Sequence, residues 1–399
     1  MKEGNVDITI FGGGVAGLWA LNHLVNLGYS TILIEKDKLG KGQTISCQGI
    51  VHGGIKYALS SDVRPDSVAE VKDMPRRWQQ HLSGERKDPN LTNVKVQSDY
   101  CHMWVSKGRG FRGFVESAFS PIGLMALNTK PKDVTASSPQ WFKDSARKIY
   151  RFDEPVINTS SLLEELARPH QDKIFYTNSY SFSNKDDNIE SVILEDNISG
   201  EKVKIYTSIF ILTAGIGNQG IIDAMGLSGI IMQERPLRQV VVTGDNLPEL
   251  YGHCIDGGSP TASVTTHENR DTGKRVWVIG GKIAEDGFKI GQEALAENAK
   301  RQLAPLLRGV DLSNTEWSTY DAIRAEAPNE GKRPGSIDLI KKENVYVCYP
   351  TKMALAPILA EEIECNLKKD IEKRTDNGSS GSSQPEIRVA KYPWETTIT

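Results

Sequence analysis

The glycine pattern near the N-terminus constrains the fold more than any other feature of this 399-residue chain. The stretch ITIFGGGVAG places Gly12, Gly14 and Gly17 in the order G-x-G-x-x-G, between a strand-like run at 7–11 and a helix-like run at 15–28. In such a unit the first glycine permits a tight turn, the second lets the backbone approach a pyrophosphate, and the third lets helix and strand pack closely. The pattern therefore predicts a dinucleotide-binding β-α-β unit.

An acidic residue completes this unit. Glu35 lies in the second strand-like run, STILIEK at 30–36, about 20 residues after the glycines, where a carboxylate can bind the ribose hydroxyls. It would repel a 2′-phosphate, so we expect a dinucleotide without one. The neighbouring residues expected to bind this cofactor are Val15, Ala16, Lys36 and Thr44.

A second segment with the form of a cofactor site occurs much later in the chain. FILTAGIGNQG, at 210–220, is a strand that runs into a turn of small residues. It has the form of the strand that returns beneath the dinucleotide in flavoproteins, although many strands end in Ala-Gly. We expect Ala214 and Gly215 to lie at the cofactor.

Composition excludes several other classes of protein. The formal net charge is −3, which gives no general attraction to nucleic acid. The five cysteines form no C-x-x-C pair, so we predict neither disulfides nor a metal site, and a reducing cytoplasmic location. No apolar run reaches the roughly 18 residues that a membrane-spanning helix needs, and the chain enters its first strand without a secretion signal. The mixed arginine and apolar segment at 109–127 has two readings, a buried packing segment or a peripheral contact with the inner face of the membrane.

Four segments, in order, resemble the FAD-dependent oxidoreductases of the D-amino-acid oxidase and glycerol-3-phosphate dehydrogenase superfamily. They are GGGVAG…IEK, QTISCQGIVHGGIKY, ILTAGIGN, and AIRAE followed by NVYVCYPTKMALAPILAEEI. The His-Gly-Gly segment is most similar to L-2-hydroxyglutarate and glycerol-3-phosphate dehydrogenases. The resemblance implies an α/β fold, with a Rossmann-like FAD-binding domain and an inserted mixed β-sheet substrate domain.

The resemblance also implies a discontinuous domain organisation. The FAD-binding domain is expected to comprise 1–60, 155–235 and 320–370. The substrate-binding or cap domain is expected to comprise 61–154 and 236–319. A Gly/Ser-rich stretch predicts that 371–399 is a flexible tail.

Matched to the family residue by residue, the segment after the ribose-binding acid would run along the flavin. Gln48, Gly49 and Ile50 would lie against the cofactor, His52 would be the histidine of the motif, and Tyr57 would contact substrate. A neutral imidazole can accept a hydroxyl proton at physiological pH while hydride passes to flavin N5. Two other roles stay open for the histidine, a purely structural hydrogen bond and a covalent bond to the flavin.

Two further segments contribute candidate residues. Arg324, in YDAIRAEAP, matches the arginine that holds a substrate carboxylate or phosphate in relatives, and Arg333 is the competing assignment. The turn PTKMA lacks the glycines usual before the final helix, and its Lys352, Met353 and Ala354 are expected near the flavin's N1 edge. Lys352 would either supply positive charge there or face solvent. In the substrate lobe, His253 is a candidate substrate contact. Together with Asp256 and His267 it has a spacing that fits no metal motif.

These residues lead to one main hypothesis and two alternatives. The first is an FAD-dependent dehydrogenase or oxidase that oxidises a small anionic hydroxy acid or polyol phosphate, with His52 as base and Arg324 as anion anchor. The second is an amine or amino-acid oxidase acting on a C–N bond. The third, a structural flavoprotein in RNA modification or assembly, is disfavoured because no basic, aromatic RNA motif is present. The electron acceptor stays open between oxygen, a quinone and a carrier protein.

Overall fold

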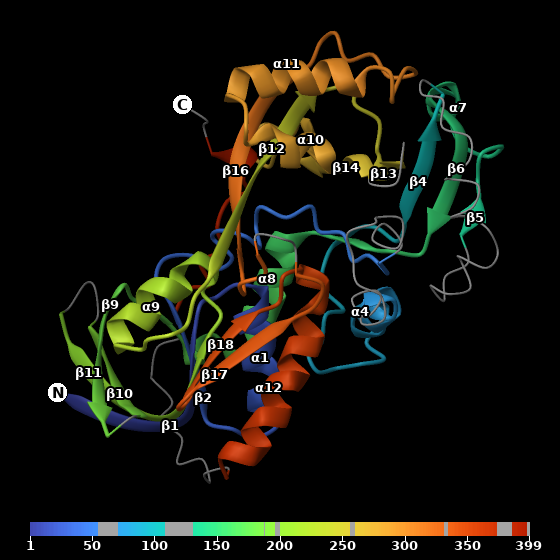
Figure 1. The fold of residues 1–399 in the computed structure, drawn as a ribbon. Helices are drawn as coiled ribbons and strands as arrows, with labels where there is room; N and C mark the ends of the chain where they lie inside the picture. The colour runs from blue at the N-terminus through green and yellow to red at the C-terminus, as the bar shows by residue number, and fades with distance from the viewer. Residues whose placement is uncertain are drawn as a thin grey trace.

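The computed structural model describes residues 1–54, 71–107, 131–186, 188–195, 200–255, 260–330, 334–372 and 385–396. These residues form two lobes, each built on an eight-stranded mixed sheet (Figure 1). A third, two-stranded sheet pairs β3 (Val96–Ser98) with β7 (Val156–Ile157). The α/β fold class expected from the sequence is confirmed.

The first sheet contains β1, the strand that leads into the glycine pattern. Its strands run in the order β17 (Asp338–Lys342), β18 (Val345–Tyr349), β11 (Lys202–Leu212), β1 (Lys2–Phe11), β2 (Thr31–Glu35) and β8 (Ile174–Tyr176). β10 (Asn188–Glu195) pairs with β11, and β9 (Ser179–Lys185) pairs with β10. The strands from β18 to β8 are parallel, and both faces are covered, which explains why β2 is buried along its whole length.

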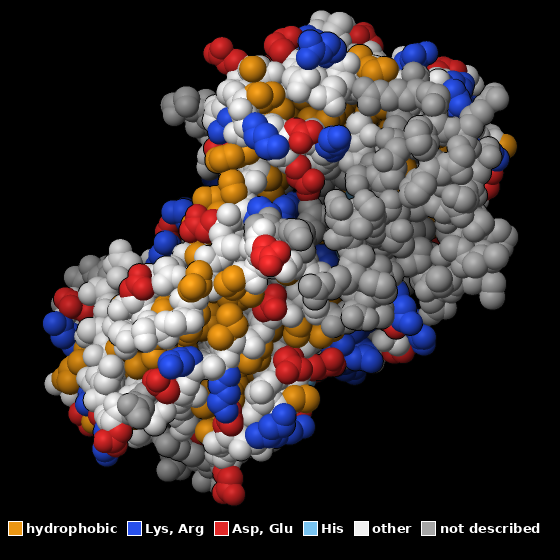
Figure 2. Space-filling view, in the orientation of Figure 1, with side chains coloured by type: hydrophobic (Ala, Val, Ile, Leu, Met, Phe, Trp, Pro, Cys, Tyr) orange, Lys and Arg blue, Asp and Glu red, His pale blue; other side chains and the backbone are white. Residues whose placement is uncertain are grey.

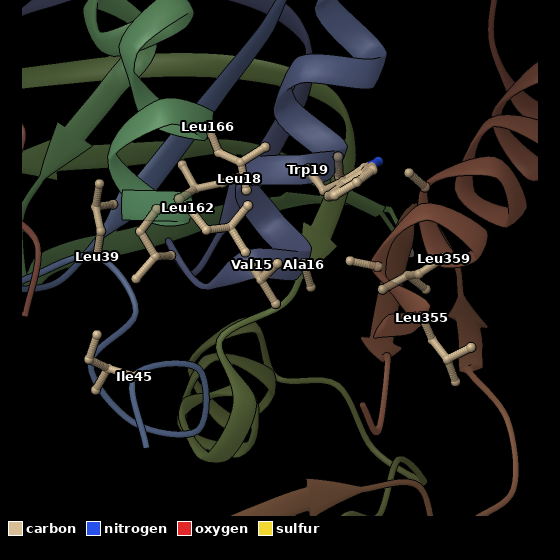
Figure 3. Packing of buried hydrophobic residues seen from close by; sticks show 14 of the residues in the cluster. Val15, Ala16, Leu18, Trp19, Leu39, Ile45, Leu162, Leu166, Leu355 and Leu359 are labelled. Atoms are coloured by element: carbon tan, nitrogen blue, oxygen red, sulfur yellow. The ribbon is translucent and has the colours of Figure 1, made fainter. Parts of the chain in front are cut away.

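Three helices pack on one face of this sheet, namely α1 (Val15–Asn26), α8 (Thr159–Ala167) and α12 (Ala356–Asp370). Figure 3 shows Leu18 of α1 against Leu162 and Leu166 of α8, with Trp19 on the side of Leu359 in α12. The short helix α4 (Met74–Leu82) joins the same core through Trp78. The opposite face is covered by β9, β10 and α9 (Asn218–Met225).

The second sheet forms the other lobe. Its strand order is β16 (Glu316–Glu326), β12 (Gln233–Gly244), β15 (Arg275–Gly280), β14 (Pro260–Glu268), β13 (Tyr251–Ile255), β4 (Cys101–Ser106), β6 (Ala146–Phe152) and β5 (Lys132–Asp133). One face packs on α7 (Gln140–Ser145), α10 (Lys282–Gly287) and α11 (Gln292–Leu303). From the other face Val241, Val278 and Tyr320 enter the core of the first lobe. The two lobes therefore share a continuous apolar core.

The strand positions differ from the expected domain limits at two places. β12 crosses the boundary expected at residue 235, and β16, in the second sheet, crosses the one expected at 320. The described part of 61–154 is also divided between the lobes, because α4 packs on the first core while β4 and β6 belong to the second sheet. β4 and β6 are short, so their alternation of apolar and polar residues is too brief to be recognised within a proline-rich stretch.

The segment 385–396 differs from the flexible tail expected for 371–399. Tyr392 and Trp394 are buried in the core of the first lobe, and the segment forms a parallel bridge between Val389 and Leu39. Its aromatic residues provide the apolar area that keeps it docked. The segment 109–127 lies outside the described residues, and no helix in the described ranges is long and apolar enough to cross a membrane.

Candidate functional site

The glycine loop contacts the end of β11, as the sequence predicts. Gly12 has φ +102°, and a Cβ placed there would lie 2.5 Å from the Cα of Ala214. A Cβ on Gly17 would lie 2.0 Å from the carbonyl oxygen of Gly12 and 2.6 Å from Oγ1 of Thr213. Only glycine permits this close contact of turn, helix and strand. Gly215, the other expected residue of the returning strand, follows at φ +60° in a short 3-10 turn.

The N-terminus of α1 opens directly from this loop. Gly14 is its N-cap, and Val15 and Ala16 lie buried in its first turn. The amide of Val15 donates to Oγ1 of Thr44 at 3.2 Å, so the loop after β2 lies across the start of the helix. The amides of a first helical turn, with the positive end of the helix dipole, form a binding site for phosphate.

Glu35 ends β2 beside the loop. Its Oε2 accepts from the amide of Gly13 at 2.7 Å, and its Oε1 accepts from the amide of Asp37 at 3.1 Å. Burial raises the pKa of Glu35, and these backbone hydrogen bonds act in the opposite direction. The carboxylate is thus fixed next to the glycines, as a ribose-binding acid requires. Lys36 is exposed immediately after it.

The segment after this loop lies between the two lobes. The carbonyl of Ser46 accepts from Nε2 of Gln239 and from the hydroxyl of Tyr320, both at 2.9 Å. The side chain of Gln48 donates to the carbonyls of Val278 at 2.8 Å and Ser263 at 3.1 Å. The second sheet therefore holds this segment in place through strands β12, β14, β15 and β16.

The same segment is held from the other side by β7. Gly49 has φ +73° and its carbonyl accepts from the amide of Ile157 at 2.8 Å, while Ile50 forms a bridge with Val156. His52 follows and is only 5% exposed. Residues 46–50 are therefore held in place by hydrogen bonds to the second sheet on one side and to β7 on the other.

A buried carboxylate that the sequence analysis missed contacts the backbone of the residue that follows His52. Oε1 of Glu154 accepts from the amide of Gly53 at 2.5 Å, and the Glu154 residue is 5% exposed. The sequence signal for this residue is weak, because Glu154 lies 101 positions from Gly53 in an unremarkable DEP turn. Tyr57, the expected aromatic of the motif, lies outside the described residues.

Arg324 lies on the face of β16 that is directed at the first lobe. Tyr320 and Ala322, which alternate with it along the strand, both belong to the core shared by the lobes. The Arg324 side chain is 24% exposed, and its Nη1 lies 3.7 Å from Oε1 of Glu285 in α10. The structure thus brings Arg324 to the same side of the sheet as the 46–50 segment. Arg333, the competing assignment, lies outside the described ranges.

The turn before α12 contains a non-glycine residue in the left-handed conformation, where relatives usually have glycine. Thr351 takes the left-handed conformation, at φ +56°, in the turn that lacks glycine. The Lys352 ammonium donates to the carbonyl of Gly335 at 2.7 Å, and its role at the flavin stays a prediction. The carbonyl of Ala354 accepts from Trp78 at 3.0 Å, and Met353 contacts Cys47, with 3.8 Å between the sulfurs. Burial raises the pKa of Cys47 to about 11, so it stays a thiol.

The histidines of the substrate lobe are buried among its strands. Nδ1 of His253 lies 2.7 Å from Oγ of Ser263, and the residue is 1% exposed. Nε2 of His267 lies 2.9 Å from Oγ1 of Thr265, and burial lowers the pKa of His267 to about 3. Within the described residues no group of three His, Cys, Asp or Glu side chains could hold a metal ion.

A polar pocket that the sequence did not predict opens at the ends of β2 and β8. It has a volume of about 500 Å³ and is lined by Lys36, Asp37, Tyr176, Asn178 and Arg388. Lys36 and Asp37 follow the ribose-binding acid directly, and Tyr176 pairs with Glu35 across the two strands.

Taken together, these features fit FAD. The Cβ contacts at Gly12 and Gly17 show that this cradle tolerates only glycine, the α1 N-terminus can bind a pyrophosphate, and Glu35 can bind a ribose. The polar pocket continues the same edge of the sheet beyond the ribose position.

Comparison with known proteins agrees with this fit. Residues 7–364 match the family model described as FAD dependent oxidoreductase, DAO. The chain is 34% identical to the probable FAD-dependent oxidoreductase PA4991 of Pseudomonas aeruginosa, over 99% of this chain and 98% of that protein. The crystal structure of PA4991 superposes with a TM-score of 0.81 at 30% identity and covers 100% of both chains.

More distant structures share the fold alone. Glycine oxidase from Geobacillus kaustophilus superposes with a TM-score of 0.65 at 13% identity, over 92% of this chain and 96% of that one. L-alpha-glycerophosphate oxidase from Mycoplasma pneumoniae, with FAD bound, gives a TM-score of 0.64 at 13% identity, over 93% of this chain and 97% of that one. Their names point to different substrates, so the fold does not identify the substrate. The family itself is established: this chain belongs to the DAO family of FAD-dependent oxidoreductases.

Proposed function

We propose that this FAD-dependent oxidoreductase oxidises a small organic anion at a C–OH carbon, as a hydroxy-acid or polyol-phosphate dehydrogenase or oxidase does. When bound, FAD supplies a two-electron acceptor. The observation that carries the proposal is the common location of Arg324 and the 46–50 segment on one face of the second sheet, linked through Tyr320 and Ser46.

In this proposal Arg324 binds the anionic group of the substrate. A guanidinium can bind a carboxylate or phosphate through two parallel hydrogen bonds. Partial burial of Arg324 strengthens such a contact, because water screens it less.

His52 accepts the hydroxyl proton. The amide of Val51 donates to the carbonyl of Pro155 at 2.9 Å, and the amide of Gly53 donates to Glu154, so both neighbours of His52 are fixed. Imidazole is the side chain best suited to accept a proton at neutral pH, and the fixed backbone on both sides holds His52 in place for this role.

One observation favours a second candidate, oxidation of an amino acid at its C–N bond. Arg324 and Glu285 place a cation and an anion side by side, 3.7 Å apart. This arrangement would match the carboxylate and the ammonium group of an amino acid. In that case the substrate amine would lose its own proton, and His52 would be a pocket residue.

An anaerobic substrate screen tests both candidates. The purified holoprotein is mixed with L- and D-2-hydroxy acids, glycerol phosphate, amino acids and N-methyl amines, and the loss of the oxidised-flavin absorbance is followed. We expect reduction by a hydroxy compound, slowed about 10²- to 10⁴-fold in His52→Gln with FAD still bound. The matched control is His170→Gln, which lies outside this region in the 3-10 turn after α8.

The outcomes separate the candidates. Reduction by amino acids alone would favour C–N oxidation and would remove the proton-accepting role from His52. Full-rate reduction of His52→Gln by a hydroxy acid would overturn that role as well. For both candidate functions, Arg324→Lys is expected to raise KM more than it lowers kcat, because the substitution weakens binding of the anionic group of the substrate.

We propose a small molecule, and not a nucleic acid, as the binding partner of this protein. On the face shown in Figure 2, basic and acidic side chains are interspersed over both lobes, which supports a small-molecule substrate rather than a nucleic acid. Oxygen, a quinone or a carrier protein is proposed as electron acceptor. A reoxidation assay with each of the three acceptors would distinguish them.

A further inference from the structure

The segment 385–396 joins the loop that follows the ribose-binding acid. The amide of Leu39 donates to the carbonyl of Arg388 at 2.7 Å, and the amide of Ala390 donates to the carbonyl of Leu39 at 3.1 Å. Leu39 lies four residues after Glu35. A segment more than 340 positions away in the chain is therefore paired with the cofactor loop.

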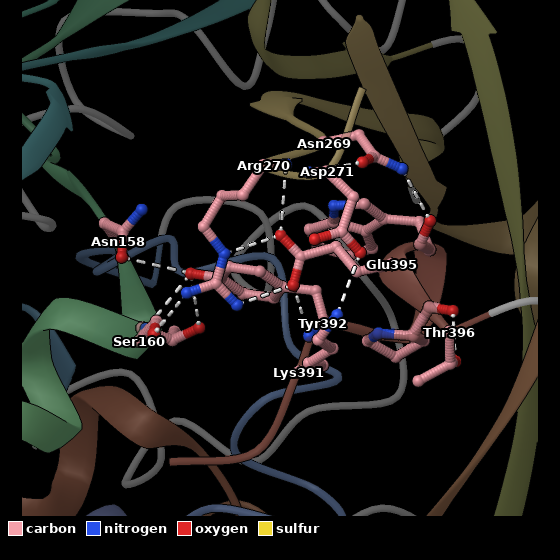
Figure 4. A network of polar contacts seen from close by, with 12 residues as sticks. Asn158, Ser160, Asn269, Arg270, Asp271, Lys391, Tyr392, Glu395 and Thr396 are labelled. Atoms are coloured by element: carbon pink, nitrogen blue, oxygen red, sulfur yellow. Dashed lines mark hydrogen bonds and ion pairs between the residues drawn. The ribbon is translucent and has the colours of Figure 1, made fainter. Parts of the chain in front are cut away.

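This segment is anchored firmly on its other side. The hydroxyl of Tyr392 accepts from the amide of Ser160 at 3.0 Å, and the Tyr392 ring stacks on Trp394 at a centroid distance of 4.5 Å. Glu395 forms an ion pair with Arg270 in the hairpin between β14 and β15 (Figure 4). The backbone at Arg388 is thus held by its pairing with Leu39 and by the anchored residues that follow it.

Arg388 lines the polar pocket beside Tyr176. Its guanidinium carbon lies 5.0 Å from the centre of the Tyr176 ring, and its amide donates to the Tyr176 hydroxyl at 3.2 Å. Asn178, which carries both a donor and an acceptor, lines the same pocket. The pocket begins at Lys36, one residue beyond the ribose-binding acid.

We propose that Arg388 forms one wall of the site for the adenine ring of FAD, with its guanidinium stacked on a face of that ring. Adenine is flat and has a polar edge, so it needs a planar group on its face and a side chain such as Asn178 at its edge. A guanidinium stacks on aromatic faces, whereas a lysine ammonium does not offer a plane. The proposal rests on FAD as cofactor and on Glu35 as the ribose acid, and it is independent of the substrate.

The test measures FAD binding to the apoprotein, by quenching of flavin fluorescence, rather than turnover. We expect Arg388→Met to raise the Kd for FAD about 5- to 30-fold, as the loss of a partly desolvated cation–π contact does. The matched control is Lys391→Met, on the same segment, whose exposed ion pair with Asp271 lies away from the pocket. Its Kd is expected to equal that of the unmodified protein.

Two more measurements separate stacking from other roles. Arg388→Lys keeps the charge and loses the plane, so the Kd should stay raised; full recovery of FAD binding in this variant would overturn stacking. Free ADP should compete with FAD for the unmodified protein and compete more weakly for Arg388→Met.

A merely structural role would show a different pattern. In that case Arg388→Met would lower the midpoint of thermal unfolding of the apoprotein and leave the Kd for FAD unchanged, which would overturn the proposal. A substrate screen in which no hydroxy or amino compound reduces the flavin would contradict the proposed function, but it would leave the FAD and ADP measurements interpretable.

Discussion

The guanidinium of Arg270 and the carboxylate of Glu395 meet edge to edge, with Nε–Oε1 and Nη2–Oε2 distances of 2.6 Å each. The Glu395 side chain is 1% exposed, whereas that of Arg270 is 48% exposed. Burial acts to raise the pKa of Glu395, but the hydrogen bond from Arg270, the amide of Tyr392 and the charge of Arg270 together outweigh it, so the pKa is lowered. This pair fastens the segment 385–396 to the second sheet.

The pair predicts a pH dependence of stability. A carboxyl group with a lowered pKa in the folded state contributes stability above its unfolded pKa of about 4.3, and this contribution is lost as the pH falls through the folded pKa. Glu395→Gln should therefore lower the free energy of unfolding by about 2 kcal/mol at pH 7 and by less at pH 3. Urea titrations at both pH values measure this difference. Glu316→Gln, in an exposed pair with Lys274, is the control and should change little; an equal loss in both variants would contradict the prediction.

Gly17→Ala should abolish FAD binding. The added Cβ would lie 2.0 Å from the Gly12 carbonyl oxygen, so the loop or α1 must move. We expect apoprotein that is destabilised by several kcal/mol and shows no bound-flavin absorbance. The control is Gly4→Ala in β1, whose added Cβ meets no atom within 4 Å, and this variant should retain the cofactor. Bound-flavin absorbance in purified Gly17→Ala would contradict the prediction and show that the glycine loop can rearrange around the added methyl group.

Glu35→Ala should weaken FAD binding without unfolding the protein. The substitution removes the acceptor of the Gly13 amide at 2.7 Å and the proposed acceptor of the ribose hydroxyls. Hydrogen bonds to a charged group contribute about 1.5–3 kcal/mol each, so the Kd for FAD should rise by about 10- to 100-fold. Fluorescence titration of the apoprotein measures it, and Glu35→Gln should lie in between.

Glu343→Gly should stabilise the protein. Glu343 occupies φ +54° in the two-residue turn between β17 and β18. Removing the steric cost of the left-handed conformation raises the free energy of unfolding by about 1–2 kcal/mol. Glycine loses more conformational entropy on folding, which costs about 0.5–1 kcal/mol, so the net gain is about 0.5–1 kcal/mol. Thermal unfolding checks this, with Glu343→Ala as the control that keeps the backbone strain. A gain of the same size in the alanine variant would show that the carboxylate, not the backbone, was unfavourable.

FAD as the cofactor could be predicted because the sequence signals for it are local. Gly12, Gly17 and Glu35 fall at fixed intervals around one turn, and their roles follow from backbone geometry alone. A second local pattern, a strand ending in small residues, places Ala214 among the expected cofactor residues, and the structure brings Ala214 against Gly12.

The rest depends on contacts between distant parts of the chain, which no periodicity encodes. Glu154 reaches Gly53, and Arg388 reaches the loop at Leu39, only after the sheets assemble. The Gly/Ser-rich stretch gives no sign of the apolar anchor that Tyr392 and Trp394 form beyond it. The bond of Lys352 to the Gly335 carbonyl depends on a turn that the sequence does not specify.

The pairing of β1 with β11 has a consequence for synthesis on the ribosome. Lys2 lies opposite Val203 and Phe11 opposite Leu212, so one edge of β1 has no partner until about two hundred further residues have been translated. At about 5–20 residues per second this interval lasts roughly 10–40 s. During that time the buried edge of a nascent parallel sheet is open to pairing with other chains, the situation in which chaperones are needed.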